Sequence, residues 1–561
     1  MMWTEGFIHP ALILFLGCLV LPLISKKTQG LFFPLFPLAA LWICWNVPLN
    51  QGVQIEFMQY QLSIFEVDRL SRIFGVIFSL ITVAAGIFAS HLRDTRQHIS
   101  ALIYAGSALG VVFAGDWITL FVFWEVMAIS SSLLIWTRNN QSFNVGLRYL
   151  VVHLLGGSIL LGGILWHIHD GGNIIIDSLK SDQFPSWLLV IGIGLNAAIP
   201  PLQAWLADAY PKATITGAIF LSALTTKSAV YLLVRVASGW EILIILGVVM
   251  AVYGVVYAVL VNDIREILSY HIISQVGYMV VGIGIGTQFA INGVVAHAVC
   301  HILYKALLFM GAGAVLKQTG KSNLMELGGL FKSTPLTFFL YMVGAFSISG
   351  FPLFNGFISK SMVISAAREE GFQVIFVFLI LSSVGTFLHT GLKLPYYTWF
   401  GPNRSIELVS TPPNMYIAMG MLAGFCILFG VAPSILYDLL PYSVDYKPYT
   451  GSHLVESIQL ISAGFLGFWW LRSKFSSEAK IVLDVDWIYR KGFRGLSHSL
   501  LLRIRRLFDN AELKLFEISR WLTHYSRNPS YALKSMRPSL EVTGSLILLS
   551  FILFLVISIF K

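Results

Sequence analysis

Ionisable side chains recur inside long apolar segments of this sequence, where a charge is costly to bury. The stretch FVFWEVMAIS places Glu125 near the centre of one segment, and FLSALTTKSAVYLLVR places Lys227 near the centre of another. A charge at the middle of a membrane helix costs about 2.5–3.5 kcal/mol on insertion scales, so such residues are functional candidates by default. Burial favours the neutral form of each group, and an approaching opposite charge reverses that preference. Side chains of these types can therefore take up and release protons at membrane depth.

More groups of this kind follow later in the chain. HAVCHILYKALLFMGAG places His297, His301 and Lys305 at a spacing of four residues, which puts them on one face of a helix. FPLFNGFISKSMVIS adds Lys360. Histidine titrates near neutral pH and can pass protons between neighbours. The pattern predicts a series of proton-exchanging groups on successive helices along the middle plane of a membrane.

Several of these residues also have simpler interpretations. Lys393 lies near the end of its apolar segment, where its long side chain could reach the membrane surface, and His389 could be a packed, hydrogen-bonded histidine. Glu125 and Lys227 could form a purely structural ion pair. The face with two histidines could hold a haem, but bis-histidine ligation needs opposed rings, so we expect none.

Composition identifies the elements that must position these groups. Of the 561 residues, 56% are hydrophobic and 12% are charged, and the mean hydropathy is +0.76. Soluble domains carry about 25% charged residues, whereas a bilayer-spanning helix needs about 20 apolar ones. We expect an all-α polytopic membrane protein with about sixteen spans. The first span begins at Phe7 without a basic flank or cleavage site, so we expect it to be retained.

Loop charges and helix breakers predict the organisation of the spans. Lys and Arg concentrate in alternate loops, which places the N-terminus outside the cell (inner) membrane by the positive-inside rule. Two sets of five spans, 99–236 and 240–399, have opposite orientations because five is odd. The fourth span of each set contains breakers, Pro200 and Pro201 in one and Gly350 and Pro352 in the other. Matching interrupted helices are the sequence signature of an inverted-repeat transporter with its ion path at the breaks.

The remaining segments complete the predicted domain organisation. Residues 1–98 hold N-terminal spans, 414–471 additional spans, and 540–561 a last span. Residues 472–539 carry 14 Lys/Arg against 6 Asp/Glu, and their apolar residues recur at helical spacing. This predicts an amphipathic helix on the cytoplasmic membrane face or on a partner protein. The four cysteines have no metal-site spacing and no nucleotide-binding loop is present, so we expect no metal, cofactor or nucleic acid.

Several longer stretches carry a family resemblance, in order across about residues 65–400. They are FWEVMA, PLQAWLADAYPKAT, NDIREILSYHIISQVGYM, HAVCHILYKALLFMGAG, LGGLFKSTPLT and SGFPLFNGFISK. The chain resembles the antiporter-like subunits of respiratory complex I, membrane-bound hydrogenases and Mrp-type multisubunit cation/proton antiporters. FLSALTTKSAVYLLVR and DVDWIYRKG are most similar to the D subunit of the Mrp type. The C-terminal amphipathic helix and last span are similar to the lateral helix of the most distal complex I subunit.

The resemblance implies roles for the buried groups. It implies that Glu125 is a carboxylate paired with a lysine and that Lys227 is the eighth-helix lysine. It also implies that the eleventh helix carries a proton relay and that Lys360 lies toward the exit of the proton path. The relay residues are His297, His301 and Lys305. Two positions depart from the family. Asn196 stands where a lysine partner of the glutamate is usual, and Arg265 stands where many members have lysine. Neither Asn nor Arg exchanges protons in practice. Either Lys227 replaces the missing partner, which we favour, or the first half has lost proton transport.

These observations predict a proton-translocating subunit of a multisubunit membrane complex. We expect a cation(Na⁺)/proton antiporter whose other membrane subunits are its partners, with no redox or hydrolytic site in this chain. One alternative is a pump subunit of a redox-driven complex such as complex I or a hydrogenase. Others are the membrane subunit of a proton-driven uptake system and a purely structural scaffold.

Overall fold

The computed structural model describes residues 8–138, 142–472, 483–485 and 487. The chain divides into a compact unit, Met1–Asp486, and a second unit, Trp487–Lys561. The predicted amphipathic segment, apart from the few residues just named, and the predicted last span lie outside the described residues. All that follows concerns the first unit.

The described residues are mainly helical, as the composition predicts. Ten helices are long and apolar enough to cross a membrane, and three shorter apolar ones accompany them, Pro10–Leu23, Phe184–Asn196 and Pro335–Ser349. The elements are α1 (Pro10–Val20), α2 (Gln29–Phe32), α3 (Leu35–Asn46), β1 (Gly52–Phe57), β2 (Tyr60–Glu66), α4 (Arg69–Ala89), α5 (Thr95–Phe113), α6 (Trp117–Trp136), α7 (Phe143–His169), α8 (Phe184–Asn196), α9 (Ala204–Ala209), α10 (Ile215–Ala223), α11 (Thr225–Val236), α12 (Ile242–Leu260), α13 (Ile264–Ile285), α14 (Gln288–Thr319), α15 (Pro335–Ser349), α16 (Asn355–Glu369), α17 (Gln373–Thr386), α18 (Pro413–Val431), α19 (Ser434–Tyr437) and α20 (Gly451–Leu471).

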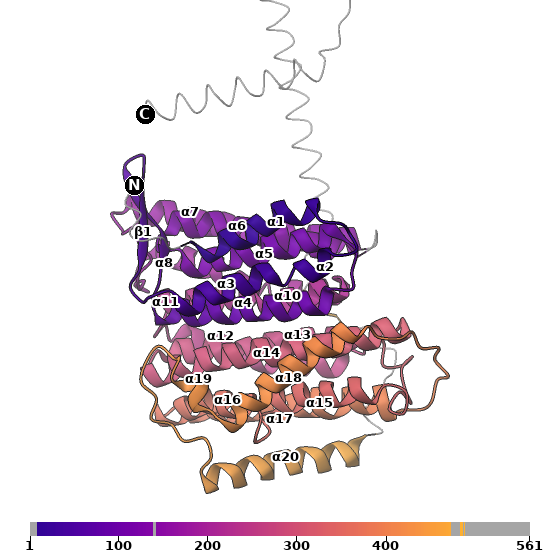
Figure 1. The fold of residues 1–561 in the computed structure, drawn as a ribbon. Helices are drawn as coiled ribbons and strands as arrows, with labels where there is room; N and C mark the ends of the chain where they lie inside the picture. The colour runs from indigo at the N-terminus through magenta and orange to yellow at the C-terminus, as the bar shows by residue number, and fades with distance from the viewer. Residues whose placement is uncertain (1–7, 139–141, 473–482, 486, 488–561) are drawn as a thin grey trace, which may run out of the picture. The chain divides into compact units, whose positions relative to one another are not determined.

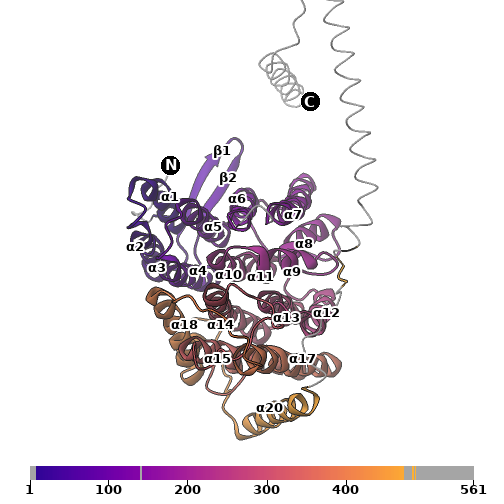
Figure 2. The same cartoon turned by 90° about the vertical axis from the view of Figure 1, so that its right-hand side faces the viewer.

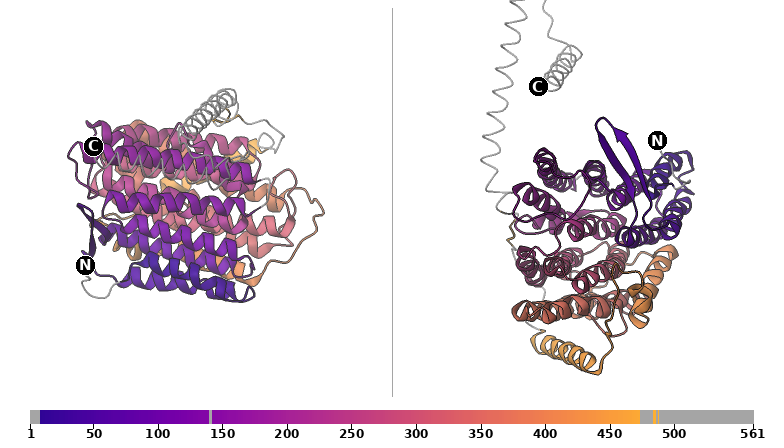
Figure 3. Two further views of the ribbon diagram at one scale, coloured as in Figure 1. Left: turned by 90° about the horizontal axis from the view of Figure 1, so that it is seen from above. Right: turned by 90° about the vertical axis from the view of Figure 1, so that its left-hand side faces the viewer.

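The helices of the first unit run alongside one another in successive layers. The first set, α5 to α11, lies above the second set, α12 to α17, in Figure 1, and α20 lies beyond α17. Figure 2 and Figure 3 show α1 to α4 beside the first set and α18 beside the second. The centre of the bundle is formed by α10, α11, α13 and α14, whose membrane-crossing stretches are almost wholly buried. Groups on these helices are therefore shielded from lipid.

Both predicted helix interruptions are present. The first separates α8 from α9 around Pro200 and Pro201, and the second separates α15 from α16 around Gly350 and Pro352. Each contains a non-glycine residue in the left-handed region, Ala198 (φ 60°) and Leu353 (φ 73°). Such backbone costs about 1–3 kcal/mol and is concentrated at functional sites.

Two further irregularities were not predicted. The last span of the predicted set 99–236 is divided at Leu224 (φ −99°, ψ −63°) into α10 and α11. The last span of the predicted set 240–399 changes after α17 to π-helical turns, Phe387–Lys393 and Tyr396–Phe400. π-helical turns are rare in proteins, and those that occur are often found at functional sites. Lys227 follows the first irregularity, and His389 and Lys393 lie within the second.

The all-helical expectation needs one correction. Strands β1 and β2 form an antiparallel hairpin in which Phe57 pairs with Tyr60. Apolar and polar residues alternate along both strands, and this period of two is a strand pattern that a span search overlooks. The hairpin leads into α4, whose first turn is capped by Asp68.

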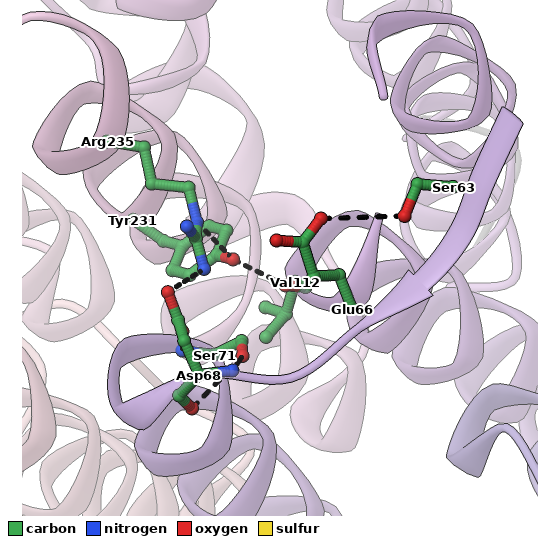
Figure 4. A network of polar contacts seen from close by, with 7 residues as sticks. All are labelled: Ser63, Glu66, Asp68, Ser71, Val112, Tyr231 and Arg235. Carbon is green, nitrogen blue, oxygen red and sulfur yellow. Dashed lines mark hydrogen bonds and ion pairs between the residues drawn. The ribbon is translucent and has the colours of Figure 1, made fainter. Parts of the chain in front are cut away.

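Figure 4 shows the polar network at this end of α4. The carboxylate of Asp68 accepts a 2.7 Å hydrogen bond from the amide of Ser71 and forms a 2.8 Å ion pair with Arg235 on α11. Arg235 also donates to the hydroxyl of Tyr231, which donates to the carbonyl of Val112. Burial by itself would raise the pKa of Asp68, but the charge of Arg235 and the hydrogen bonds from Ser71 outweigh it and lower the pKa below the ordinary range of an aspartate. The pair joins the hairpin end of α4 to the end of α11.

Candidate functional site

Glu125 lies in the interface between α6 and α7, two helices of the first set. A Cβ atom built on Gly157 would overlap Glu125 Oε1, so the carboxylate occupies the space that glycine leaves open on α7. Oε1 is buried without a hydrogen-bond partner. The Glu125–Lys227 ion pair that we favoured is not formed: the ion pairs of the described residues are Arg148–Asp208 and Arg235–Asp68.

Lys227 instead binds the end of its own interrupted helix. Its ammonium group donates to the carbonyl of Ser222 at 2.6 Å and to the hydroxyl of Thr226 at 3.1 Å. Ser222 belongs to the last turn of α10, where carbonyls lack helical partners and the helix dipole is negative. The division of the helix at Leu224 therefore provides a binding place for a fully buried lysine.

Asn196 is the last residue of α8 and directly precedes the first break. Its side chain is fully buried, and both amide atoms lack a hydrogen-bond partner. The short helix α9 that follows is held by Trp205, whose indole donates to Leu195 O at 3.0 Å, and by the bidentate contact of Arg148 with Asp208. Pro200 has no N–H to donate to the carbonyl of Asn196. The break is thus a polar, rigidly held place at membrane depth.

The three predicted groups on α14 are buried in the centre of the bundle. The rings of His297 and His301 lie 6.2 Å apart, and His297 Nδ1 lies 3.2 Å from the hydroxyl of Ser359 on α16. Both ring nitrogens of His301 and the ammonium nitrogen of Lys305 lack a partner. Lys227 of the first set is close enough to interact electrostatically with His301 and Lys305. The two sets therefore meet at these charges.

Lys360 binds a backbone carbonyl at the second break, as Lys227 binds a carbonyl at the end of α10. Its ammonium group donates to Ile348 O at 2.6 Å and to the hydroxyl of Ser383 at 3.3 Å, and it lies over the ring of Tyr278. In a continuous helix the carbonyl of Ile348 would bind the amide of residue 352, but Pro352 has none. The proline that was identified as a helix breaker thus explains how a carbonyl becomes available to Lys360.

A cavity of about 630 Å³ begins at Lys360 and extends between α16, α17, α20 and the loop that precedes α20. Charged and polar side chains, among them Arg368, Asp445, His453 and Glu456, line it together with apolar ones. His453 is held by a hydrogen-bond contact with Pro448 O and stacks on Phe357 at 4.6 Å. Lys360 therefore joins the buried groups to a cavity that charged side chains help to line.

Lys393 lies in the π-helical segment at the end of the second set. It is buried and donates to the carbonyls of Val259 and Val261 at 2.9 and 3.3 Å, so it caps the end of α12. His389, in the same π-helical segment, lies 5.7 Å from the ring of His271 on α13. Neither ring has a hydrogen-bond partner. His271 was not among the predicted residues, although it lies in an apolar segment within a quoted motif.

Arg265 has contacts that suit a structural role. Its guanidinium group is buried and donates to the carbonyls of Tyr210, Ala213 and Thr214 at 3.0–3.2 Å. These carbonyls connect α9 with α10. Arg265 therefore joins the second set to the first at the segment that follows the first break.

The structure buries five of the predicted residues on the helices at and next to the centre of the bundle, and these are Lys227, His297, His301, Lys305 and Lys360. Of the others, Glu125 faces Gly157, whereas Arg265 and Lys393 bind backbone carbonyls. The spacing of residues in the sequence could not predict which helix Glu125 faces, because the rotation of α6 about its axis depends on packing.

Comparison with known proteins agrees with this arrangement. Residues 114–388 match the family described as NADH:quinone oxidoreductase/Mrp antiporter, TM. An uncharacterized protein of Methanocaldococcus jannaschii is 30% identical over 394 residues, which are 65% of this chain and 80% of that protein. The D subunit of a Na(+)/H(+) antiporter of Alkalihalophilus pseudofirmus is 32% identical over 322 residues, 53% of this chain and 64% of that protein. The chain spans about half the length, 52%, of the A subunit of that organism's antiporter.

Solved structures share the fold. A chain of the Mrp complex from Dietzia sp. superposes with a TM-score of 0.74 at 21% identity, over 98% of this chain and 62% of that one. A chain of the membrane-bound sulfane sulfur reductase, an archaeal respiratory membrane complex, superposes with a TM-score of 0.72 at 22% identity. The match covers 98% of this chain and 99% of that one. The resemblance and the helical membrane fold are therefore confirmed, and the two antiporter relatives are named as subunits. The chain belongs to the family of transmembrane subunits that NADH:quinone oxidoreductases and Mrp antiporters share.

Proposed function

We propose that this chain is a proton-translocating subunit of a multisubunit cation/proton antiporter in the cell membrane, with its N-terminus outside. The observation that carries the proposal is the series of buried titratable groups that runs from Lys227 through the groups of α14 to Lys360, which lines the cavity of about 630 Å³. Buried ionisable groups without partners are costly, so a series of them across two repeats favours a function in ion transfer. The Na(+)/H(+) antiporter relatives support sodium as the exchanged cation.

The lysines support a specific way of moving protons. Lys227 and Lys360 each bind a carbonyl at a helix interruption, where the negative end of a helix dipole stabilises the charged ammonium form. The ammonium group of Lys305 has no such partner. A proton on Lys227 or Lys360 disfavours a second charge on Lys305, so charging one group drives a proton off the next. The histidines on α14 connect these positions, and Lys393 with His389 forms the other end of the second set.

A second candidate has its own support. The fold extends over 99% of a chain from the membrane-bound sulfane sulfur reductase, an archaeal respiratory membrane complex. The same buried groups would then transfer protons under a redox driver. The partners of the chain distinguish the two functions.

The test starts with the native complex. We would purify the chain from its own membrane in mild detergent, identify stoichiometric partners by mass spectrometry, and measure sodium-induced collapse of a pH gradient in everted vesicles. We expect small antiporter-type membrane subunits, and we expect Lys360→Ala and Glu125→Gln to abolish exchange while Lys180→Ala, in an exposed loop, retains it. Iron–sulfur or quinone-binding partners would favour the redox-driven function. Full exchange in both site variants would contradict the proposed route.

A further inference from the structure

We propose that His153 is the proton-exchanging partner of Glu125 in the first set of helices. This inference deepens the proposed function and rests on it. His153 lies on α7 and is 1% exposed, and it was not among the residues predicted from the sequence.

The two side chains meet at one stretch of α7. The Glu125 carboxylate lies against Gly157, and His153 precedes Gly157 by one helical turn. Residues four apart on a helix have Cβ atoms about 5–6 Å apart on the same face. His153 also faces the first break, because its ring packs at 4.5 Å against Trp205, which binds Leu195. His153 is therefore positioned between the glutamate and the break.

The hydrogen bond of His153 determines which nitrogen is available. Nδ1 lies 2.9 Å from the carbonyl of Tyr149, and a carbonyl can only accept, so Nδ1 carries the hydrogen. Nε2 then presents a lone pair, and it is buried without a partner. Glu125 Oε1 is also buried without a partner. A protonated carboxyl group and an imidazole lone pair are complementary, and a water molecule can mediate the hydrogen bond between two such groups.

A chain of hydroxyl groups continues from His153 toward Lys227. The imidazole ring stacks on Tyr149 at 4.0 Å, and Tyr149 donates to Ser131 at 3.0 Å and lies 3.5 Å from the hydroxyl of Thr225. Thr225 precedes by two residues the lysine that starts the central series. His153 therefore links the otherwise isolated glutamate with Lys227.

The exchange is a simple proton transfer that conserves charge. The proton leaves the carboxyl group of Glu125 and binds Nε2 of His153, so the products are a carboxylate and an imidazolium. The reverse transfer restores two neutral groups. Both states keep Nδ1–H on the Tyr149 carbonyl, so the ring does not need to turn.

The test uses the complete native complex and two readouts. His153→Gln is expected to lower exchange about 100-fold, as for loss of a positioned proton-transfer group, and the double variant with Glu125→Gln is expected to lose no more than Glu125→Gln alone. His167→Gln is the matched control, because His167 is a buried histidine of the same helix whose Nε2 also lacks a partner, and it lies more than three turns beyond His153. It is expected to retain exchange.

Infrared difference spectra provide the second readout. The carboxyl band that disappears in Glu125→Gln is expected to shift in His153→Gln and to stay in place in His167→Gln. If His153→Gln does not accumulate, pH-difference spectra of the unmodified complex decide, because the Glu125 and imidazole bands must titrate together. Full exchange with an unshifted band in His153→Gln, or independent titration, would overturn the role of His153. Absence of exchange in the unmodified complex would instead contradict the proposed function, and the infrared result would still decide on His153.

Discussion

The hydroxyl group of Tyr270 donates a 2.6 Å hydrogen bond to the carboxylate of Asp484, 214 residues later in the chain. Tyr253 of α12 donates to the other carboxylate oxygen, and Tyr257 donates to the carbonyl of Leu483 at 3.1 Å. Asp484 belongs to DVDWIYRKG, the stretch that resembles the D subunit of the Mrp type. Three packed tyrosines thus bind this stretch to α12 and α13.

Removal of the Asp484 carboxylate should release this contact. Asp484→Ala leaves two tyrosine hydroxyls without an acceptor, at a cost of about 1–3 kcal/mol for each buried group. We expect faster hydrogen exchange in the peptide that contains residues 483–485 and a lower melting temperature. Asp484→Asn keeps one acceptor oxygen, so its hydrogen exchange and melting temperature should lie between those of the unmodified protein and of Asp484→Ala. Equal exchange in all three proteins would show that the tyrosines do not hold the segment.

Gly157 should be essential because Glu125 fills its space. Gly157→Ala places Cβ on the position of Oε1 and forces the carboxylate to move. We expect loss of sodium–proton exchange with normal accumulation of the protein. Gly162→Ala on the same helix is the control, because nothing lies within 4 Å of its Cβ position. A similar loss in both variants would point to a general effect on α7.

Arg265 should be required for stability and not for proton exchange. Arg265→Lys shortens the side chain and replaces the planar guanidinium with a point charge, so it cannot reach all three carbonyls. We expect a loss of about 1–3 kcal/mol in the free energy of unfolding. Arg96→Lys, at an exposed position, should change little. Unchanged melting of Arg265→Lys would exclude this role.

The Asp68–Arg235 pair should give a pH-dependent stability. The pKa of Asp68 is lower in the folded chain than in the unfolded chain, so the pair stabilises the fold above the unfolded pKa and loses its contribution as the pH falls through the folded pKa. Both side chains are partly exposed, so we expect Asp68→Asn, which retains a helix cap, to cost only about 0.5–1 kcal/mol at neutral pH. The difference from the unmodified chain should disappear in acid. Thermal unfolding in detergent measures it, and a difference that persists in acid would contradict the assignment.

The sequence by itself determined the features that depend on local chemistry. Long apolar runs identify the spans, and charges within them identify Lys227, Lys305 and Lys360, because the cost of a buried charge does not depend on its neighbours in the fold. Pro200 and Pro352 identify the breaks, because a missing N–H interrupts a helix beyond its first turn. Counting the spans predicts two sets of five.

Only the tertiary structure decided which of these groups meet. The rotation of α6 turns Glu125 toward Gly157 and away from Lys227, and the division at Leu224 turns Lys227 toward Ser222. His153, His271 and Asp484 acquire their significance from neighbours that lie far away in sequence or on other helices. Helix rotation, a mid-helix break without proline and long-range docking arise from the packing of many side chains at once. No single stretch of the chain contains that information.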